Sequence, residues 1–336
     1  MRKWATVIAI AVALSATAWT GAWFFIAQKT GDAIDKWIED EKSRDRFWAC
    51  AGKRTEGFPF QLNLRCDSPT FASPTGPVQT GAAQRLLAEA SVTSPFHIDF
   101  KIEGPLKLTT RSGAAAIRWD AFNGSVKTRT ATPDISMNAK GLVVEEASAD
   151  LSAWARTRTS EVAIRVQPSP DRAPGSDVQL VTTSIDGMSA APLDTLLGSA
   201  DPFRTSLSAL VMNAGSANSG TFAERLDRWT ESGGRVQIGS LTAEKGASRL
   251  EANGDLALDE RRRPSGKLSV RVVGVQPLLA RLNLPSAPLA IEGLLRGTGN
   301  RGGASLLENR TLPLELRAGR LYIGPLRTPI VIPPLI

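Results

Sequence analysis

The chain has 336 residues, of which 42% are apolar, 22% charged and 6% aromatic, and its formal net charge is +7. One histidine, His97, and two cysteines are too few for a multi-histidine metal centre or for a zinc site built from cysteine alone. No G-x-S-x-G or S-x-x-K motif marks a serine nucleophile, so we expect no catalytic residue, metal or cofactor. The positive charge suits an anionic lipid surface, and without an RNA-binding motif we expect no nucleic acid partner.

Residues 4–27 contain no charged residue and are long enough to cross a hydrocarbon core, which needs about 20 helical residues. Arg2 and Lys3 precede this run, so the positive-inside rule leaves a short N-terminus in the cytoplasm and the body in the periplasm. A cleaved signal peptide is the alternative, but aromatic residues continue the apolar run past the small-residue site at 16–18. We therefore predict that residues 1–28 anchor a single-pass inner-membrane protein.

The pattern over residues 29–48 predicts a stalk helix that continues the membrane helix outward. Asp32 and Lys36 form an opposite-charge pair at helical i,i+4 spacing. Trp37 and Trp48 belong to a sparse apolar stripe that we expect to dock on the first strands.

Cys50 and Cys66 both lie on the exported side, 16 residues apart. In an oxidising compartment such a pair favours a disulfide, worth roughly 3 kcal/mol in the loop-entropy model. A redox-active pair is the alternative, but it usually needs closer spacing such as C-x-x-C. The predicted bridge encloses the segment 57–60.

Several motifs resemble those of an uncharacterised family of bacterial envelope proteins, the domain-of-unknown-function 2125 family. The motif residues near the N-terminus are Trp48, Cys50, Gly57, Phe58, Pro59, Phe60, Leu62 and Cys66. Segments 256–268 and 319–326 resemble the same family. The resemblance implies an envelope location and a shared architecture, and it carries no assigned activity.

Alternation of polar and apolar residues, bounded by glycine, proline and asparagine, recurs along the rest of the chain and predicts strands. The alternating segments are 61–66, 96–102, 116–122, 162–166, 178–185, 236–238, 249–258 and 267–273. They predict a mainly β, β-rich α+β fold in which residues 49–336 form a long, mostly antiparallel curved sheet or a sandwich. The apolar tail, residues 330–336, is expected to add a last strand.

Short helices are predicted at residues 84–90, 221–231 and 277–284, the second of them capped by Asn218 or Ser219. The turn-rich segments 168–177 and 214–220 are candidate divisions between two lobes.

Two further motifs suggest chemistry. Residues 297–302 match G-x-G-x-x-G, but without the acidic residue that a dinucleotide site needs, we interpret them as a glycine turn. Arg261, Arg262 and Arg263 precede a proline and are expected to form a charged hairpin tip that contacts anionic lipid.

These features favour a non-enzymatic, membrane-anchored periplasmic protein that binds or conducts lipid or maintains the envelope. Its architecture is similar, more distantly, to that of the lipid-conducting AsmA-type envelope proteins. A protein-protein scaffold is the alternative, and a hydrolase acting through carboxylates such as Glu145, Glu146, Asp259 and Glu260 is the third class.

Overall fold

The computed structural model describes residues 2–128, 133–172, 177–217, 220–274, 311–324 and 326–335. The helices are α1 (Arg2–Lys42), α2 (Ala191–Leu197), α3 (Phe222–Glu231) and the 3-10 helices η1 (Ala149–Trp154) and η2 (Ala214–Ala217). The first nine strands are β1 (Phe47–Glu56), β2 (Gln61–Ala72), β3 (Val78–Ala82), β4 (Arg85–Ser91), β5 (Ser94–Glu103), β6 (Leu106–Thr110), β7 (Gly113–Arg118), β8 (Ala121–Lys127) and β9 (Asp134–Ala147). The remaining strands are β10 (Arg158–Pro168), β11 (Val178–Met188), β12 (Phe203–Met212), β13 (Arg235–Lys245), β14 (Ser248–Leu258), β15 (Pro264–Val273), β16 (Thr311–Arg317), β17 (Arg320–Ile323) and β18 (Leu326–Val331).

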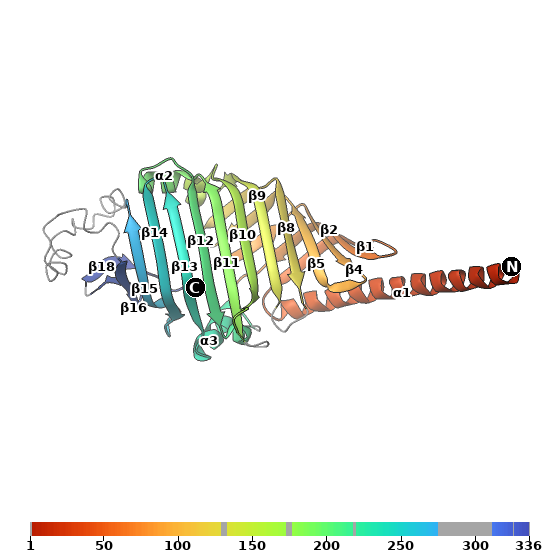
Figure 1. Ribbon diagram of the computed structural model, residues 1–336. Coiled ribbons are helices and arrows are strands. Elements are labelled where there is room, and N and C mark those ends of the chain that lie inside the picture. The colour runs from red at the N-terminus through yellow and green to blue at the C-terminus, as the bar shows by residue number, and fades with distance from the viewer. Residues whose placement is uncertain are drawn as a thin grey trace.

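The strands form one continuous antiparallel sheet (Figure 1). From β9 to β18 every strand pairs with its successor. Antiparallel neighbours can be joined by short turns, as β13–β14 and β14–β15 are, whereas helices occupy the β11–β12 and β12–β13 connections. The predicted β-rich fold with an apolar N-terminal helix and a few short helices is confirmed.

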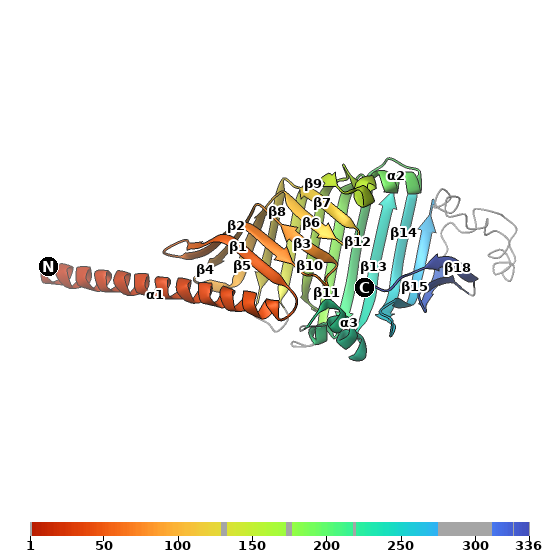
Figure 2. The same cartoon turned by 180° about the vertical axis from the view of Figure 1, so that it is seen from behind.

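β2 and β9 each change partner partway along their length. β2 pairs with β4 over residues 61–67 and with β3 over residues 70–72. In the same way, β9 pairs with β8 over residues 134–140 and with β7 from residue 143. β4, β5 and β8 belong to the part of the sheet that faces the viewer in Figure 1. β3, β6 and β7 belong to the part that faces the viewer in Figure 2. We call the line along which the partners change the crease.

Special backbone conformations mark the crease. Ser68 on β2 and Gly141 on β9 have positive φ angles of 52° and 62°, at the points where each strand changes partner. Trp119, between β7 and β8, is only 8% exposed, and its indole Nε1 donates a hydrogen bond to the carbonyl of Ile102 at 2.9 Å. A Cβ on Gly104 would lie 3.3 Å from the indole ring, so glycine leaves room for it. The crease is therefore built around a buried tryptophan.

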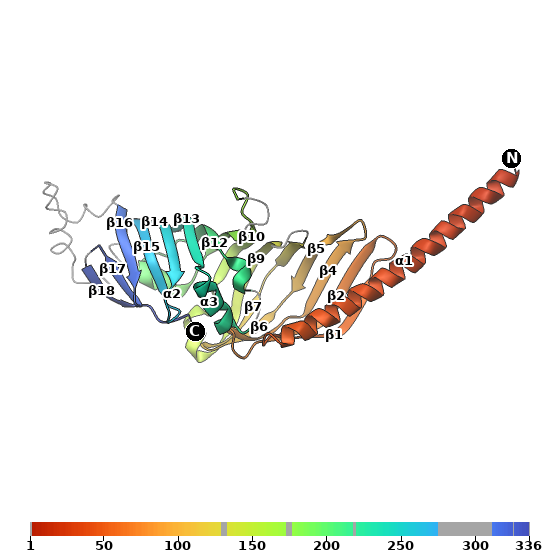
Figure 3. The same cartoon turned by 90° about the horizontal axis from the view of Figure 1, so that it is seen from below.

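Helices lie along the edges of the sheet (Figure 3). α1 packs along the edge strand β1, where the ring of Trp48 lies 5.8 Å from that of Trp37 and 4.5 Å from that of Phe71. At the end of α1, the buried Glu41 carboxylate accepts hydrogen bonds from Arg44 at 2.8 Å and Arg46 at 2.6 Å. The helix ends at Lys42, before the predicted limit of residue 48, and Trp48 lies on β1.

The predicted helix over residues 84–90 is wrong, since these residues form β4. Their leucine and alanine residues favour helices, but pairing with β2 and β5 on both sides overrides that weak propensity. The predicted strand over 116–122 is interrupted at the crease and becomes β7 and β8.

The helix predicted at 221–231 is confirmed as α3. Its cap is Thr221, whose side chain accepts from the Glu224 N–H, while the Glu224 carboxylate accepts from the Thr221 N–H. The predicted cap residues 218 and 219, and the predicted helix 277–284, lie outside the described residues. Both candidate lobe divisions connect strands that pair directly, β10 with β11 and β12 with β13.

Candidate functional site

One row of apolar residues runs across the whole sheet, and each member lies directly opposite the next. The row contains, in order, Leu62, Ala90, Ile98, Val126, Ile135, Val166, Val181, Ala209, Ile238, Gly254, Leu268, Leu314 and Ile323. Directly paired residues point to the same face of a sheet. The row therefore forms an apolar stripe from β2 to β17.

A second row runs beside the first on the same face from β2 to β16, two residues away on each strand and three residues away at the irregularity in β13. Its members are Leu64, Ala88, Phe100, Gly124, Met137, Ile164, Thr183, Leu207, Leu241, Ala252, Val270 and Leu312. Thr183 is its one hydroxyl residue, and the Phe100 ring occupies the space where Gly124 has no side chain. We call the surface formed by the two rows the apolar face.

The intervening residues point to the opposite face and are polar. Their row contains Asn63, Glu89, Asp99, Ser125, Ser136, Arg165, Thr182, Ser208 and Ser240. A hollow of about 680 Å³ lies on this polar face between β5 and β13. Its lining includes no aromatic ring, and we assign no ligand to it.

The apolar face is only partly shielded from solvent. Most side chains of the two rows are half-buried, and those that are almost fully buried are Leu62, Ala209, Ile238, Ala252 and Val270. The described helices lie along the edge strand or at the ends of strands rather than across these rows (Figures 1 and 2). A face of this kind normally packs against a second layer, and extended exposed apolar surface marks a binding site.

The length of the apolar face is unusual. Thirteen strands at a spacing of about 4.8 Å extend over roughly 58 Å, about twice the thickness of a bilayer hydrocarbon core. The rows consist almost entirely of aliphatic groups that form no hydrogen bonds. The face can therefore accommodate long apolar groups, and it offers no chemistry for bond cleavage.

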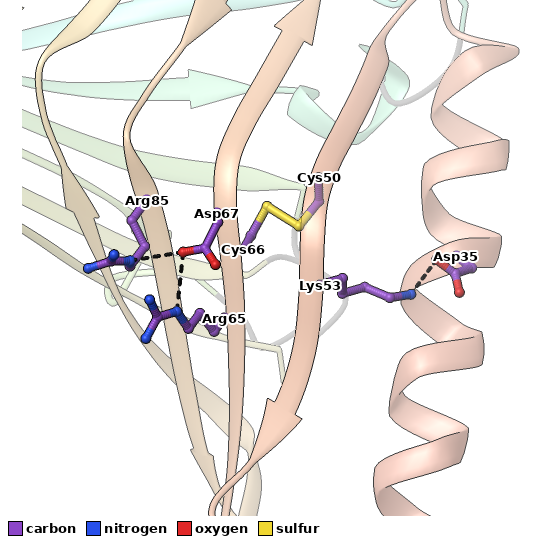
Figure 4. The surroundings of a disulfide bond; sticks show 7 residues. All are labelled: Asp35, Cys50, Lys53, Arg65, Cys66, Asp67 and Arg85. Carbon is purple, nitrogen blue, oxygen red and sulfur yellow. Dashed lines mark hydrogen bonds and ion pairs between the residues drawn. A yellow bond between two sulfur atoms is a disulfide. The ribbon is translucent and has the colours of Figure 1, made fainter.

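The predicted cysteine pair lies at the start of this face (Figure 4). A disulfide joins Cys50 on β1 to Cys66 on β2, with the Cα atoms 5.5 Å apart. Cys66 is buried and lies opposite Leu86, in line with the apolar side chains of β4. The bridge holds the edge strand β1 against the first strand that carries the apolar face.

An ion-pair cluster lies beside the disulfide (Figure 4). The Asp67 carboxylate accepts hydrogen bonds from Arg85 at 3.0 Å and Arg65 at 3.2 Å. These bonds, the one from Arg85 foremost, hold the pKa of Asp67 below its usual value, although desolvation opposes them. Lys53 on β1 pairs with Asp35 on α1 at 2.5 Å. The Asp67 group thus links β2 to β4, and the separate Lys53–Asp35 pair links β1 to α1.

The motif residues Gly57, Phe58, Pro59 and Phe60 form the turn between β1 and β2. This turn packs against α1, because the Trp19 indole donates to the Pro59 carbonyl and the Trp23 indole to the Gln61 carbonyl, both at 3.0 Å. Gly57 has a φ of 105°, and a Cβ there would lie 2.8 Å from the Gln61 carbonyl oxygen. The turn therefore requires glycine at this position.

The arginines predicted to contact anionic lipid form the β14–β15 turn. Arg262 pairs with Asp227 on α3 through two hydrogen bonds of 2.7 Å, and Arg263 pairs with Asp259 at 2.7 Å. The hydrogen bond from Arg262 lowers the pKa of Asp227. Arg261 is exposed. Two of the three charges are thus neutralised within the chain, and the contact of this turn with lipid stays a prediction.

The structure brings together no catalytic constellation among its described residues. His97 is part of the exposed polar surface, 3.4 Å from Asp99. Glu145 pairs with Arg118 and Asp259 with Arg263, so neither predicted acid pair converges on a cleft. No cluster of three metal-ligating side chains occurs among those residues either. The glycine motif at 297–302 lies outside them.

Sequence reasoning identified many strands of the apolar face but not its continuity. The alternation of Ile98 or Val181 with polar neighbours shows which residues share a face of one strand. The register between strands, which aligns those residues into rows, depends on long-range pairing.

Comparisons with known proteins agree with the family motifs. α1 is long and apolar enough to cross a membrane, by length and composition. No curated protein and no solved structure matches the chain, so the likeness to AsmA-type proteins stays an architectural analogy. A family model described as "Uncharacterized protein conserved in bacteria (DUF2125)" matches residues 23–330. The chain therefore belongs to the DUF2125 family of bacterial proteins.

Proposed function

We propose that the protein is a membrane-anchored, non-enzymatic lipid-binding protein of the bacterial envelope. In this proposal α1 crosses the inner membrane, the body lies in the periplasm, and the apolar face holds or conducts the acyl chains of lipids. The uninterrupted row from Leu62 to Ile323 is the observation that carries the proposal.

The composition of the face favours lipid over a protein partner. Protein interfaces are enriched in tyrosine, tryptophan and arginine at their centres. The two rows contain one aromatic residue, Phe100, one thioether, Met137, and one hydroxyl residue, Thr183, among aliphatic groups, alanine and glycine. Acyl chains need apolar contact without hydrogen-bond partners, which is what such rows provide.

The scaffold alternative has less support from two places where a partner protein could dock, the Trp37–Trp48 pair and the C-terminal tail. Trp37 and Trp48 pack against each other at the joint between α1 and β1 rather than standing free for a partner. The tail is partly engaged as well, since the Leu335 N–H donates to the Arg262 carbonyl at 3.1 Å.

Site-specific photo-crosslinking in cells tests the proposal. A photoreactive amino acid replaces Val181, on the apolar face, and in a matched variant it replaces Thr182, on the polar face of the same strand. We expect lipid adducts from position 181 and few from position 182. Protein adducts at position 181 would instead favour the scaffold, and equal lipid labelling at both positions would contradict the proposal.

A further inference from the structure

The end of the sheet nearest the N-terminus carries two uncharged turns that contact each other. The first contains residues 57–60, between β1 and β2, and the second contains Val92 and Thr93, between β4 and β5. The Val92 N–H donates to the Phe60 carbonyl at 3.0 Å. The aromatic side chains at this end are exposed, by 49% for Phe58, 65% for Phe60 and 54% for Phe96.

These turns lie against the part of α1 that is suited to the membrane. The Trp23 ring meets that of Phe58 edge-on at 5.5 Å, and the Trp19 ring lies 6.0 Å from that of Phe60. The two indole hydrogen bonds to Pro59 and Gln61 fix the same contact. The body is thus attached to the apolar run of α1 itself, in addition to the stalk beyond it.

The rise of the helix gives the depth of this contact. At about 1.5 Å per residue, Trp19 lies about 22 Å and Trp23 about 28 Å along the axis from Trp4, where the uncharged run begins. The hydrocarbon core is about 30 Å thick. An α1 that spans from Trp4 therefore places Trp23 at the outer boundary of the core and Trp19 about 8 Å inside it, so the turn that both indoles bind lies at that boundary.

We propose that Phe58 and Phe60 of the first turn, together with Phe96 at the start of β5, insert into the interfacial region of the outer leaflet, so that the body rests on the bilayer. This inference rests on the membrane anchoring in the proposed function and adds a second contact. Aromatic side chains favour that region of a bilayer, and the uncharged turns bring no charge into it.

The contact also explains where the apolar face begins. Leu62 is the second residue of β2, directly after the turn that holds Phe60, and Ile98 follows Phe96 by two residues on β5. Residues two apart on a strand point to the same face. The first members of the apolar row therefore start at the lipid surface, and an acyl chain passes from the leaflet to the apolar face without crossing water.

Depth measurements on the full chain test the inference. Phe60→Cys and Phe96→Cys are each labelled with the fluorophore NBD, with the native disulfide intact, in vesicles of phosphatidylethanolamine and phosphatidylglycerol. Phe47→Cys is the matched control, because Phe47 is 44% exposed but lies at the other end of β1, about 30 Å from the turn.

We expect blue-shifted NBD emission at positions 60 and 96. A nitroxide attached to the lipid acyl chain near the headgroup should quench most of this emission. Neither effect is expected at position 47. Emission at 60 and 96 that responds like position 47 would overturn the inference. Protection from both lipid-borne and aqueous quenchers would also overturn it, because a protein would then cover the turns.

The two proposals can fail separately. Crosslinking from position 181 reports on the apolar face, whereas NBD at positions 60 and 96 reports on the turns. If lipid-borne nitroxide quenches NBD at positions 60 and 96 but position 181 gives no lipid adducts, the membrane contact is supported and the lipid-binding function is contradicted. If Phe60→Cys fails to fold because it loses the contact with Trp19, Phe96→Cys keeps the test independent.

Discussion

The strands over residues 61–147 and those over residues 158–273 belong to one sheet but differ in how regularly they pair. The first group changes partners at the crease and needs positive φ angles at Ser68 and Gly141 and a buried Trp119. The second group consists of strands of ten or eleven residues whose irregularities are local bulges. A straight apolar face needs only alternation, whereas folding the sheet over needs particular residues at particular places.

The largest expected effect is at the centre of the crease. Trp119→Ala removes a buried indole and its hydrogen bond to Ile102, and we expect the free energy of unfolding to fall by about 3–5 kcal/mol. Chemical denaturation of the full chain in detergent measures it. Trp154→Ala, at a 40% exposed site, is the control. Equal losses at the two sites would show that the crease does not depend on its tryptophan.

The disulfide is expected to stabilise the creased part of the sheet more than the straight part. Replacing both Cys50 and Cys66 with serine should cost about 3 kcal/mol, because the open loop regains conformational entropy in the unfolded state. Amide hydrogen exchange should rise in β1 and β2 before it rises in β11–β14. A uniform rise across the sheet would mean that the two parts unfold together.

A pair of glycine substitutions compares the two parts directly. Gly141→Ala places a Cβ 2.0 Å from the Asp120 carboxylate at a φ of 62°, and we expect a loss of about 1–2 kcal/mol or more. Gly239→Ala on β13 meets no atom closer than 3.5 Å, so its effect on the thermal midpoint should be near zero. A Gly239→Ala variant less stable than Gly141→Ala would contradict the role of Gly141 in the bend.

The smallest expected effect on stability comes from protonation of Asp67 and Asp227 at low pH. Arg85 and Arg262 lower the folded-state pKa of Asp67 and Asp227 from 3.8, so the stability from these pairs is present above about pH 4. It should be lost as the pH falls through the lowered pKa values. Thermal midpoints measured from pH 5 down to pH 2 should fall less steeply in the Asp67→Asn/Asp227→Asn double variant. Parallel curves would show that other carboxylates cause the acid sensitivity.

Several elements were predictable because their signals are local. The uncharged run 4–27 marks α1, and the alternation around Ile98 and Val181 marks β5 and β11. The helix α3 was predictable from its apolar spacing. The prediction for residues 84–90 failed because leucine and alanine favour helices locally, while the partners that make this segment a strand lie elsewhere in the chain.

The candidate site was only partly predictable for the same reason. The turn 57–60 was identified by its family-like motif, but its contact with Trp19 and Trp23 joins residues about 40 positions apart. The arginine turn was found at the right place, yet the pairing of Arg262 with Asp227 depends on where α3 packs.

The sequence by itself determined the apolar N-terminal helix, the β-rich body and the cysteine pair, because each depends on residues close together or on composition. The tertiary structure alone decided that the apolar residues line up in rows across the sheet and that the strands bend at Trp119. It also decided that the turn between β1 and β2 lies against α1. The physical reason is register: a shift of one residue would turn every apolar side chain of a strand to the other face, and only the pairing of distant strands sets it.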